Sequence, residues 1–143
     1  MLKEWQASAA RAQWAQLLKG VERGDWQVIS KFNERVVAVR AQDMTELLAR
    51  SCPFTPEVLF EDESVAIWLP EFEIYGKGAS LEEAASDLLD AAREYAEEWD
   101  LTLKDAPNHR AREWHVRRIQ LASDDAALCA ALLGADAPSL FPA

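Results

Sequence analysis

One local pattern constrains the fold more than any other: a capping box that opens a long amphipathic helix. Ser80 stands where an N-cap serine belongs, and Glu83 follows three residues later, so the two side chains can bind free backbone N–H groups. Apolar residues then recur at helical spacing from Leu81 to Trp99, while acidic residues line the opposite face. The pattern predicts a helix of about twenty residues whose apolar stripe needs a packing partner.

Short apolar segments on both sides of this helix predict the rest of its domain. The expected strands are Val58–Phe60, Val65–Leu69, Ile74–Gly78 and Trp114–Leu121, and a last helix begins at Ser123–Asp125 and ends at Gly134. Acidic residues at the start of that last helix suit the helix dipole. The resulting order, β-β-β-α-β-α, predicts a three- or four-stranded sheet that the long helix covers on one face.

The first third of the chain reads as strand, helix, hairpin and helix. Ser8 is a suitable N-cap for a helix from Arg11 to Arg23, and Gly24 suits a left-handed residue at its end. The helical stripe is Ala10, Trp14, Leu17, Leu18 and Val21, the hairpin strands are Trp26–Ser30 and Val36–Arg40, and the second helix is Asp43–Arg50. The segment Ser51–Pro56 holds two prolines and predicts a domain boundary.

An N-terminal domain of about fifty residues is too small to bury much apolar surface alone. Its helical stripe, with strands on only one side, therefore implies a missing partner. Either the acidic remainder of the 143-residue chain packs against it, or two copies of the domain complete one another as a homodimer.

Acidic residues are concentrated in the middle of the chain. The sequence has 15 Lys and Arg against 25 Asp and Glu, a formal net charge of −10, and residues 56–108 hold fifteen of these acids against three basic residues. This balance argues against nucleic-acid binding that relies on total charge. The acidic segment is either a solvated surface that aids solubility or a surface for a basic partner.

No arrangement of residues predicts catalysis, a metal site or a cofactor. His109 and His115 are six residues apart and share no helix face, so they form no pair of metal ligands. No serine lies in a Gly-x-Ser-x-Gly elbow, and Gly76-Lys77-Gly78 is too short for a phosphate loop. We therefore expect a protein that is not an enzyme.

The sequence also predicts a cytoplasmic location. The N-terminus lacks the apolar core of a signal peptide, and no apolar run approaches the roughly 18 residues of a membrane span. Cys52 and Cys129 belong to no metal or redox motif, which fits a reducing compartment. The sequence alone leaves a disulfide between the two cysteines as an alternative.

The first fifty residues resemble the Phd/YefM antitoxins. The matching pieces are the Ser-capped helix Ser8–Leu18 with Ala10-Arg11-Ala12, the turn Val21–Asp25, and the strands Val28–Ser30 and Val36–Val39. In the connector Lys31–Arg35, Phe32 and Glu34 replace part of the basic turn that the family often has. The resemblance implies that residues 1–51 form a two-fold dimer, whose first helix and hairpin loop approach operator DNA.

By position, this resemblance implies six DNA-binding residues: Lys3, Ser8, Arg11, Gln13, Lys31 and Arg35. Arginine and glutamine suit base edges, and lysine and serine suit phosphate groups. For Arg11 and Lys31 the alternative is ordinary surface charge.

The remainder of the chain resembles the HicB-type antitoxin domain. The matching pieces are Val58–Asp62, Val65–Glu71 with its Leu69-Pro70-Glu71, and Gly76–Ala84. The resemblance implies a partial RNase H-like fold, without that fold's catalytic metal site, over residues 57–134. Residues 135–143 are predicted to form a flexible tail. The predicted fold class is α+β, a Phd/YefM-like α/β domain followed by a HicB-like β-β-β-α-β-α domain.

The combined layout resembles Phd-like antitoxins of RelE/RelB-type systems, which implies a basic, mRNA-cleaving toxin as partner. An acidic domain with aromatic anchors can cover such a toxin. The candidate toxin-binding residues are Trp68, Glu71, Glu73, Tyr75, Glu94, Glu97, Glu98 and Trp99. Trp99 also continues the stripe of the long helix, so a place in the core is its alternative.

The main hypothesis is therefore an antitoxin that neutralises a RelE-like toxin by direct binding and represses its own operon through the N-terminal homodimer, with no membrane and no cofactor involved. The first alternative is a stand-alone dimeric transcription regulator whose acidic domain binds another partner or ligand. The second alternative is an acidic enzyme.

Overall fold

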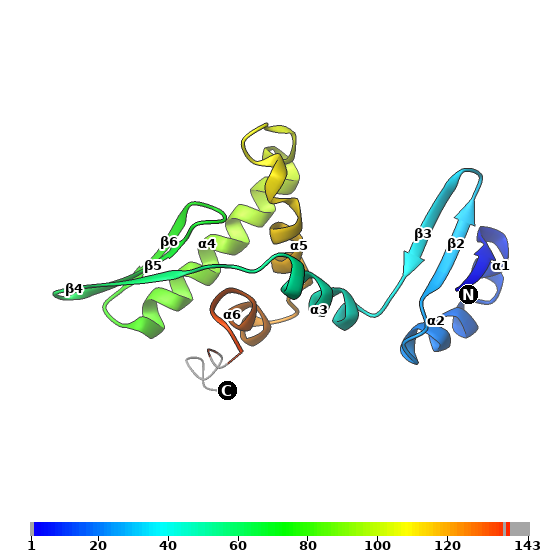
Figure 1. Ribbon diagram of the computed structural model, residues 1–143, viewed down its shortest axis with the longest axis horizontal. Helices are drawn as coiled ribbons and strands as arrows, with labels where there is room; N and C mark the ends of the chain where they lie inside the picture. Colours follow the sequence, from blue (N-terminus) through cyan, green and yellow to red (C-terminus); the bar gives the residue numbers. More distant parts are fainter. Residues whose placement is uncertain (1, 136, 138–143) are drawn as a thin grey trace. The chain divides into compact units, whose positions relative to one another are not determined.

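The computed structural model describes residues 2–135 and 137, and the chain divides into two compact units, Met1–Glu46 and Leu47–Ala143 (Figure 1). Each unit has its own three-stranded sheet and its own helices. The division falls inside helix α3 (Ala41–Ser51), which contains the predicted helix Asp43–Arg50 and ends where the proline-containing segment begins.

The first unit has the predicted order of strand, helix and hairpin. Its elements are β1 (Lys3–Gln6), α1 (Ala7–Ala12), α2 (Trp14–Glu22), β2 (Gln27–Lys31) and β3 (Glu34–Ala38). The sheet order is β1-β2-β3, with β1 parallel and β3 antiparallel to the central strand.

The predicted continuous helix from Arg11 to Arg23 is wrong in one respect, because it breaks at Gln13. The backbone of Gln13 (φ −120°, ψ 38°) leaves the helical region, so α1 ends before it and α2 begins after it. Ser8 lies inside α1 and is not the N-cap, because the extended strand β1 leads straight into the helix at Gln6. Gly24 has the expected left-handed conformation, with φ 92°.

A small core holds the first unit together. Trp5, Ala10 and Leu17 form a buried apolar cluster, and the indole N–H of Trp5 donates a hydrogen bond to Gln27 Oε1 at 2.9 Å. The buried amide of Gln27 lies directly against α2, since a Cβ on Gly20 would be 2.7 Å from Gln27 Nε2. The glycine therefore makes room for the hydrogen bond that joins β1 to β2.

The second unit is an antiparallel sheet with helices on one face. Strands β4 (Glu57–Glu61), β5 (Ser64–Leu69) and β6 (Ile74–Gly78) pair in that order, and α4 (Leu81–Leu101) packs against β6 and β5. These elements confirm the three predicted strands and the long helix. Glycines in β6 bring the layers close together, because a Cβ on Gly76 would lie 2.2 Å from the carbonyl oxygen of Ala84.

The predicted capping box is present at the start of α4. Ser80 Oγ accepts a hydrogen bond from the backbone N–H of Glu83 at 3.2 Å. The carboxylate of Glu83 reaches back and accepts from the N–H of Ala79 at 2.8 Å, one residue before the expected partner. The cap thus fixes both the helix start and the chain that enters it.

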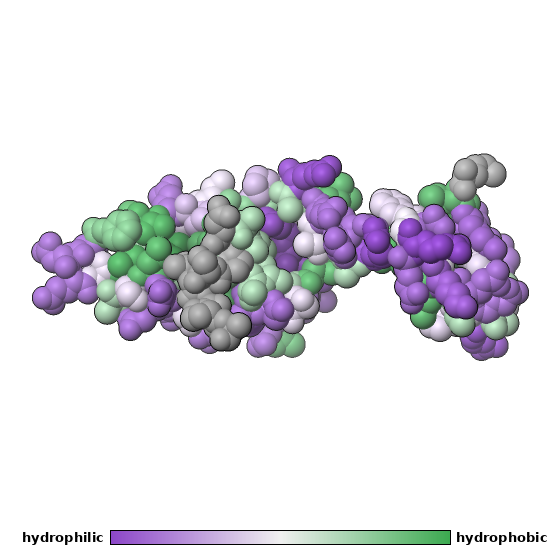
Figure 2. All heavy atoms as spheres, turned by 90° about the horizontal axis from the view of Figure 1, so that it is seen from below, coloured by the Kyte–Doolittle hydropathy of each residue, from purple (hydrophilic) through white to green (hydrophobic). Residues whose placement is uncertain are grey.

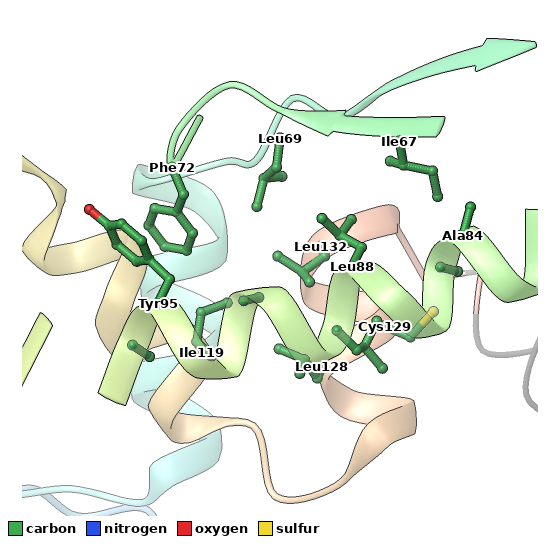
Figure 3. Close-up of a cluster of buried hydrophobic side chains, with 14 of the residues drawn as sticks. Ile67, Leu69, Phe72, Ala84, Leu88, Tyr95, Ile119, Leu128, Cys129 and Leu132 are labelled. Atoms are coloured by element: carbon green, nitrogen blue, oxygen red, sulfur yellow. The ribbon is translucent and has the colours of Figure 1, made fainter. Parts of the chain in front are cut away.

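The main core lies between the sheet and helices α4, α5 and α6 (Figure 3). Ile67 and Leu69 of β5 pack against Leu88 of α4, and Leu128 and Leu132 of α6 pack against the same helix. All five side chains are at most 1% exposed. Burial of this apolar area is the main stabilising contribution to the second unit.

The segment Trp114–Leu121, predicted as a strand, is instead helix α5 (Glu113–Leu121). Val116 and Ile119, three residues apart, are both buried, and this spacing matches one helical face packed against α4. Helix α6 (Asp125–Leu133) follows as predicted, with the Asp124 carboxylate accepting from the N–H of Ala127 at 2.8 Å. The order is therefore β-β-β-α-α-α, with short 3-10 turns at Leu103–Asp105 and Arg110–Arg112 between α4 and α5.

Both cysteines are free, so the structure contains no disulfide between them. Burial raises the pKa of the Cys129 thiol. Among the described residues, no helix combines the length and the apolar character that a membrane crossing requires. Of the predicted tail, residues 136 and 138–143 lie outside the described part of the chain.

Candidate functional site

An aromatic pair lies on the face of the second sheet that points away from α4. Val65, Ile67 and Leu69 of β5 are buried toward α4, so the alternating Trp68 points to the opposite face. Its register partner on β6 is Tyr75, and their ring centroids are 4.4 Å apart. Trp68 is half-buried and Tyr75 is exposed. The structure therefore brings these two predicted contact residues together on one surface.

Strand β4 borders the aromatic pair and forms one edge of the sheet. All five of its residues are exposed, and the three apolar ones, Val58, Leu59 and Phe60, have exposed fractions of 42%, 44% and 74%. Figure 2 shows an apolar patch beside the hydrophilic tip at this end of the unit. Leu59 pairs with Ala66 and shares the face of the aromatic pair, whereas Val58 and Phe60 lie on the α4 face. Sequence reasoning identified the strand but not its open edge.

The predicted acidic contacts fall into two groups. Glu71 and Glu73 lie in the turn between β5 and β6, and both bind within the unit. Glu71 accepts from the backbone N–H of Thr55 at 2.8 Å, and Glu73 forms an ion pair with Arg112 at 2.6 Å. The second group is exposed along α4 and consists of Glu94, Glu97 and Glu98. This second group forms an exposed acidic surface toward the C-terminal end of the helix.

Trp99 is placed in the core and not on this surface. Its side chain is 3% exposed, and its indole N–H donates to the carbonyl oxygen of His109 at 3.4 Å. Trp99 therefore occupies the core position that the apolar stripe of the long helix gave as its alternative. The prediction that Trp99 is an exposed anchor is therefore corrected.

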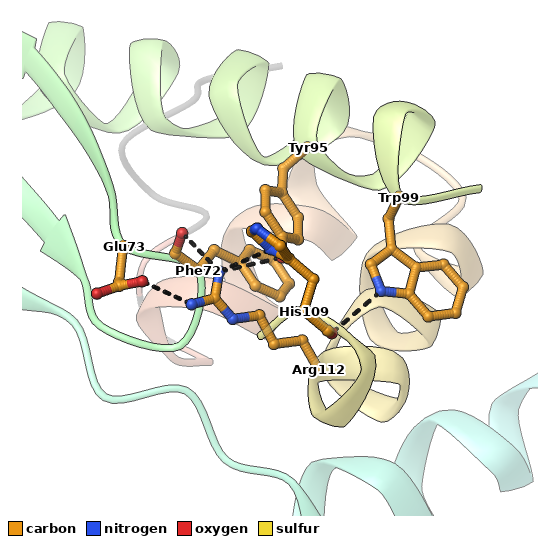
Figure 4. Close-up of polar contacts among 6 residues, drawn as sticks. All are labelled: Phe72, Glu73, Tyr95, Trp99, His109 and Arg112. Atoms are coloured by element: carbon orange, nitrogen blue, oxygen red, sulfur yellow. Dashed lines mark hydrogen bonds and ion pairs between the residues drawn. The ribbon is translucent and has the colours of Figure 1, made fainter. Parts of the chain in front are cut away.

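A polar cluster of Tyr95, His109 and Arg112 was missed by the sequence reasoning (Figure 4). The Tyr95 hydroxyl lies 2.7 Å from His109 Nδ1, and Arg112 Nη1 donates to that hydroxyl at 3.1 Å and to the carbonyl oxygen of Phe72 at 3.2 Å. Burial opposes the charge of Arg112, but hydrogen bonds to Tyr95 and Glu73 outweigh it and raise the pKa of the guanidinium. The cluster ties the chain after α4 to the β5–β6 turn.

We expect Arg112→Ala to lower the free energy of unfolding by about 1–3 kcal/mol, because it leaves the partly buried Phe72 carbonyl and Tyr95 hydroxyl without their donor. Denaturant unfolding measures this change. Arg110→Ala is the matched control, since Arg110 is exposed and, among the described residues, donates only to the carbonyl oxygen of Asp105, at 3.5 Å. Equal losses in the two variants would show that the cluster adds no stability.

One end of the first sheet gathers four of the predicted DNA-binding residues. Because β1 and β2 are parallel, both strands finish at the same end, where α1 begins and the β2–β3 hairpin turns. Ser8 and Arg11 lie one turn apart on α1, while Lys31 and Arg35 flank the hairpin turn. All four side chains are exposed.

The other two predicted DNA-binding residues, Lys3 and Gln13, lie outside this group of four. Gln13 is exposed at the break between α1 and α2, and Lys3 lies at the other end of β1 with its Nζ 4.2 Å from the Trp5 ring centroid. Arg35 Nε donates to the Glu4 carboxylate at 3.1 Å, which offsets part of its charge. Phe32 at the hairpin turn has φ 54° and is 93% exposed, a feature that the sequence reasoning did not single out as a contact.

Comparison with known proteins identifies the family. The family model described as PHD_like, antitoxin of toxin-antitoxin, RelE / RelB, TA system, matches residues 1–133. The chain belongs to this antitoxin family. A crystal structure from Syntrophomonas wolfei subsp. wolfei, described as an antitoxin part of a proposed toxin/antitoxin system, has a similar fold with a TM-score of 0.74. The two chains are 19% identical over 92% of this chain and 96% of that chain. No curated protein matches the sequence.

The antitoxin therefore has the mixed α and β fold and the general function that were predicted. Membership of the family implies a toxin as partner. The finer division into a Phd/YefM-like domain and a HicB-like domain stays a prediction.

Proposed function

We propose that this antitoxin neutralises a basic, RelE-like mRNA-cleaving toxin by direct binding through its second unit. One observation carries the proposal: the second unit combines the exposed carboxylates of α4 with apolar groups that none of the described helices covers, namely Leu59 and the Trp68–Tyr75 pair. Opposite charges would steer the encounter, and the apolar groups would hold the complex. Neutralisation of this kind needs no catalytic residue, and we propose a non-enzymatic role in the cytoplasm.

The proposal assigns repression of the operon to a homodimer of the first unit. Apolar surface supports this dimer: Trp14 is 51% exposed and Val36, the register partner of the partly buried Ile29, is 56% exposed. A hollow of about 310 Å³ lies beside them, lined by Ala7, Ala10, Arg11, Trp14 and Ile29. A second copy packed against Trp14 and Val36 would place two sets of Arg11 and Lys31 in one complex, as a two-fold symmetric operator requires.

Growth rescue tests this division of roles in the full-length chain. Expression of the toxin from the same operon should arrest growth, and co-expression of the antitoxin should restore it. The variant Trp68→Ala/Tyr75→Ala should lose rescue because its apolar anchors are gone, with circular dichroism confirming the fold. The control variant Arg11→Ala/Lys31→Ala should rescue fully. The opposite pattern, loss in the second variant alone, would show that the first unit binds the toxin.

A further inference from the structure

The free edge of β4 is open for pairing. The sheet order β4-β5-β6 leaves β4 with a partner on one side, and no described strand pairs with its other side. Alternate residues of an edge strand turn their N–H and C=O groups outward, where another strand can bind them. The β4 sequence, Glu57–Glu61, contains no proline and no lysine, which are the residues that commonly block edge pairing.

The side chains of β4 add apolar surface on both faces of this edge. Leu59 faces the same side as Trp68 and Tyr75, while Val58 and Phe60 face the α4 side. Figure 1 shows the β4–β5 hairpin extending past the helix. A strand added to β4 would therefore gain backbone hydrogen bonds and apolar contacts at once.

The charges at the two ends of β4 decide which strand fits. A second copy of β4, paired antiparallel about Leu59, would place Glu57 of each copy opposite Glu61 of the other, and like charges directly opposite are unfavourable. The adjoining turn adds Asp62 and Glu63. A strand with lysine or arginine at both ends and apolar residues between them is instead complementary in charge and in pattern.

We infer that the open edge of β4 binds a β-strand of the basic toxin, which extends the β4-β5-β6 sheet by one strand. This inference rests on the proposed function, because it names the surface through which the second unit holds its toxin. It requires the toxin to present a strand with basic residues flanking an apolar stretch.

The first test uses the full-length variant Val58→Lys/Phe60→Lys and the purified toxin from the same operon. Lysines on the edge repel a basic strand and block pairing, so we expect the dissociation constant to rise on the order of a hundredfold, mainly through faster dissociation. The control Glu94→Lys changes net charge by the same two units on α4 and should alter chiefly the association rate. Equal dissociation rates for wild type and the edge variant would overturn the inference.

Hydrogen exchange on the wild-type complex provides an independent test that needs no variant. Alternate amides of β4 should exchange at least about tenfold more slowly when toxin is bound, because they become donors to the added strand. Unchanged β4 exchange in a complex that does form would overturn the inference and leave the proposed function intact. Absence of any complex would overturn both. Protection of β4 without toxin, dependent on protein concentration, would assign the edge to a second copy and also overturn the inference.

Discussion

Reversal of the three α4 acids, Glu94→Lys/Glu97→Lys/Glu98→Lys, is expected to slow association with the basic toxin at least about tenfold at low salt. The variant changes the formal net charge from −10 to −4 on an exposed surface. Long-range attraction acts on the encounter, so the association rate should change more than the dissociation rate. The dependence of that rate on salt should weaken in parallel.

The fold of this triple variant should persist. The buried stripe of α4 is untouched, and the helix dipole favours cations near the C-terminal end where the three residues lie. A matched control, Glu22→Lys/Glu34→Lys/Glu46→Lys, makes the same charge change on exposed residues of the first unit and should slow association less. Stopped-flow binding at several salt concentrations measures both. An unchanged rate in the α4 variant would mean that this helix face is only solvated surface.

Arg11→Ala is expected to weaken operator binding by about 1–3 kcal/mol, because an exposed arginine in the last turn of α1 can donate two hydrogen bonds to one base edge. Lys31→Ala should reduce the salt dependence of binding, as loss of a phosphate contact does. Arg35→Ala should have a smaller effect, since Arg35 already pairs with Glu4 at 3.1 Å.

Gel-shift titration with the DNA upstream of the operon measures these affinities. Arg50→Ala is the control, because Arg50 is exposed on α3 and outside the first unit. Light scattering of the same sample should give a mass near twice 16.0 kDa. A monomer at tens of micromolar, or wild-type affinity in a combined Arg11, Lys31 and Arg35 variant, would contradict the DNA-binding role proposed for the first unit.

Short sequence patterns predicted well the elements that are determined by interactions between residues close together in the sequence. The capping box at Ser80, the strands that alternate around Ile67 and the glycine at position 24 all depend on neighbours close in the sequence, and each is found in the structure. The alternation of Trp68 also predicted correctly that it faces away from Val65, Ile67 and Leu69.

Elements that depend on distant contacts were predicted less well. The segment containing Val116 and Ile119 has the composition of a strand, but packing against α4 makes it a helix. Arg112 binds Phe72, which is 40 residues away, so no spacing in the sequence indicates their cluster. The sequence could not predict the open edge of β4 either, because the order of strands is a property of the whole sheet.

The measurement that tests the central claim most directly is a titration of mRNA cleavage by the purified toxin with the full-length antitoxin. We expect cleavage to fall linearly and to stop at a fixed molar ratio, because under the proposed function the second unit would occupy the toxin surface that binds RNA. The Trp68→Ala/Tyr75→Ala variant should need much higher concentrations, whereas Arg11→Ala/Lys31→Ala should match the wild type. Undiminished cleavage in the presence of excess folded antitoxin would contradict neutralisation by direct binding.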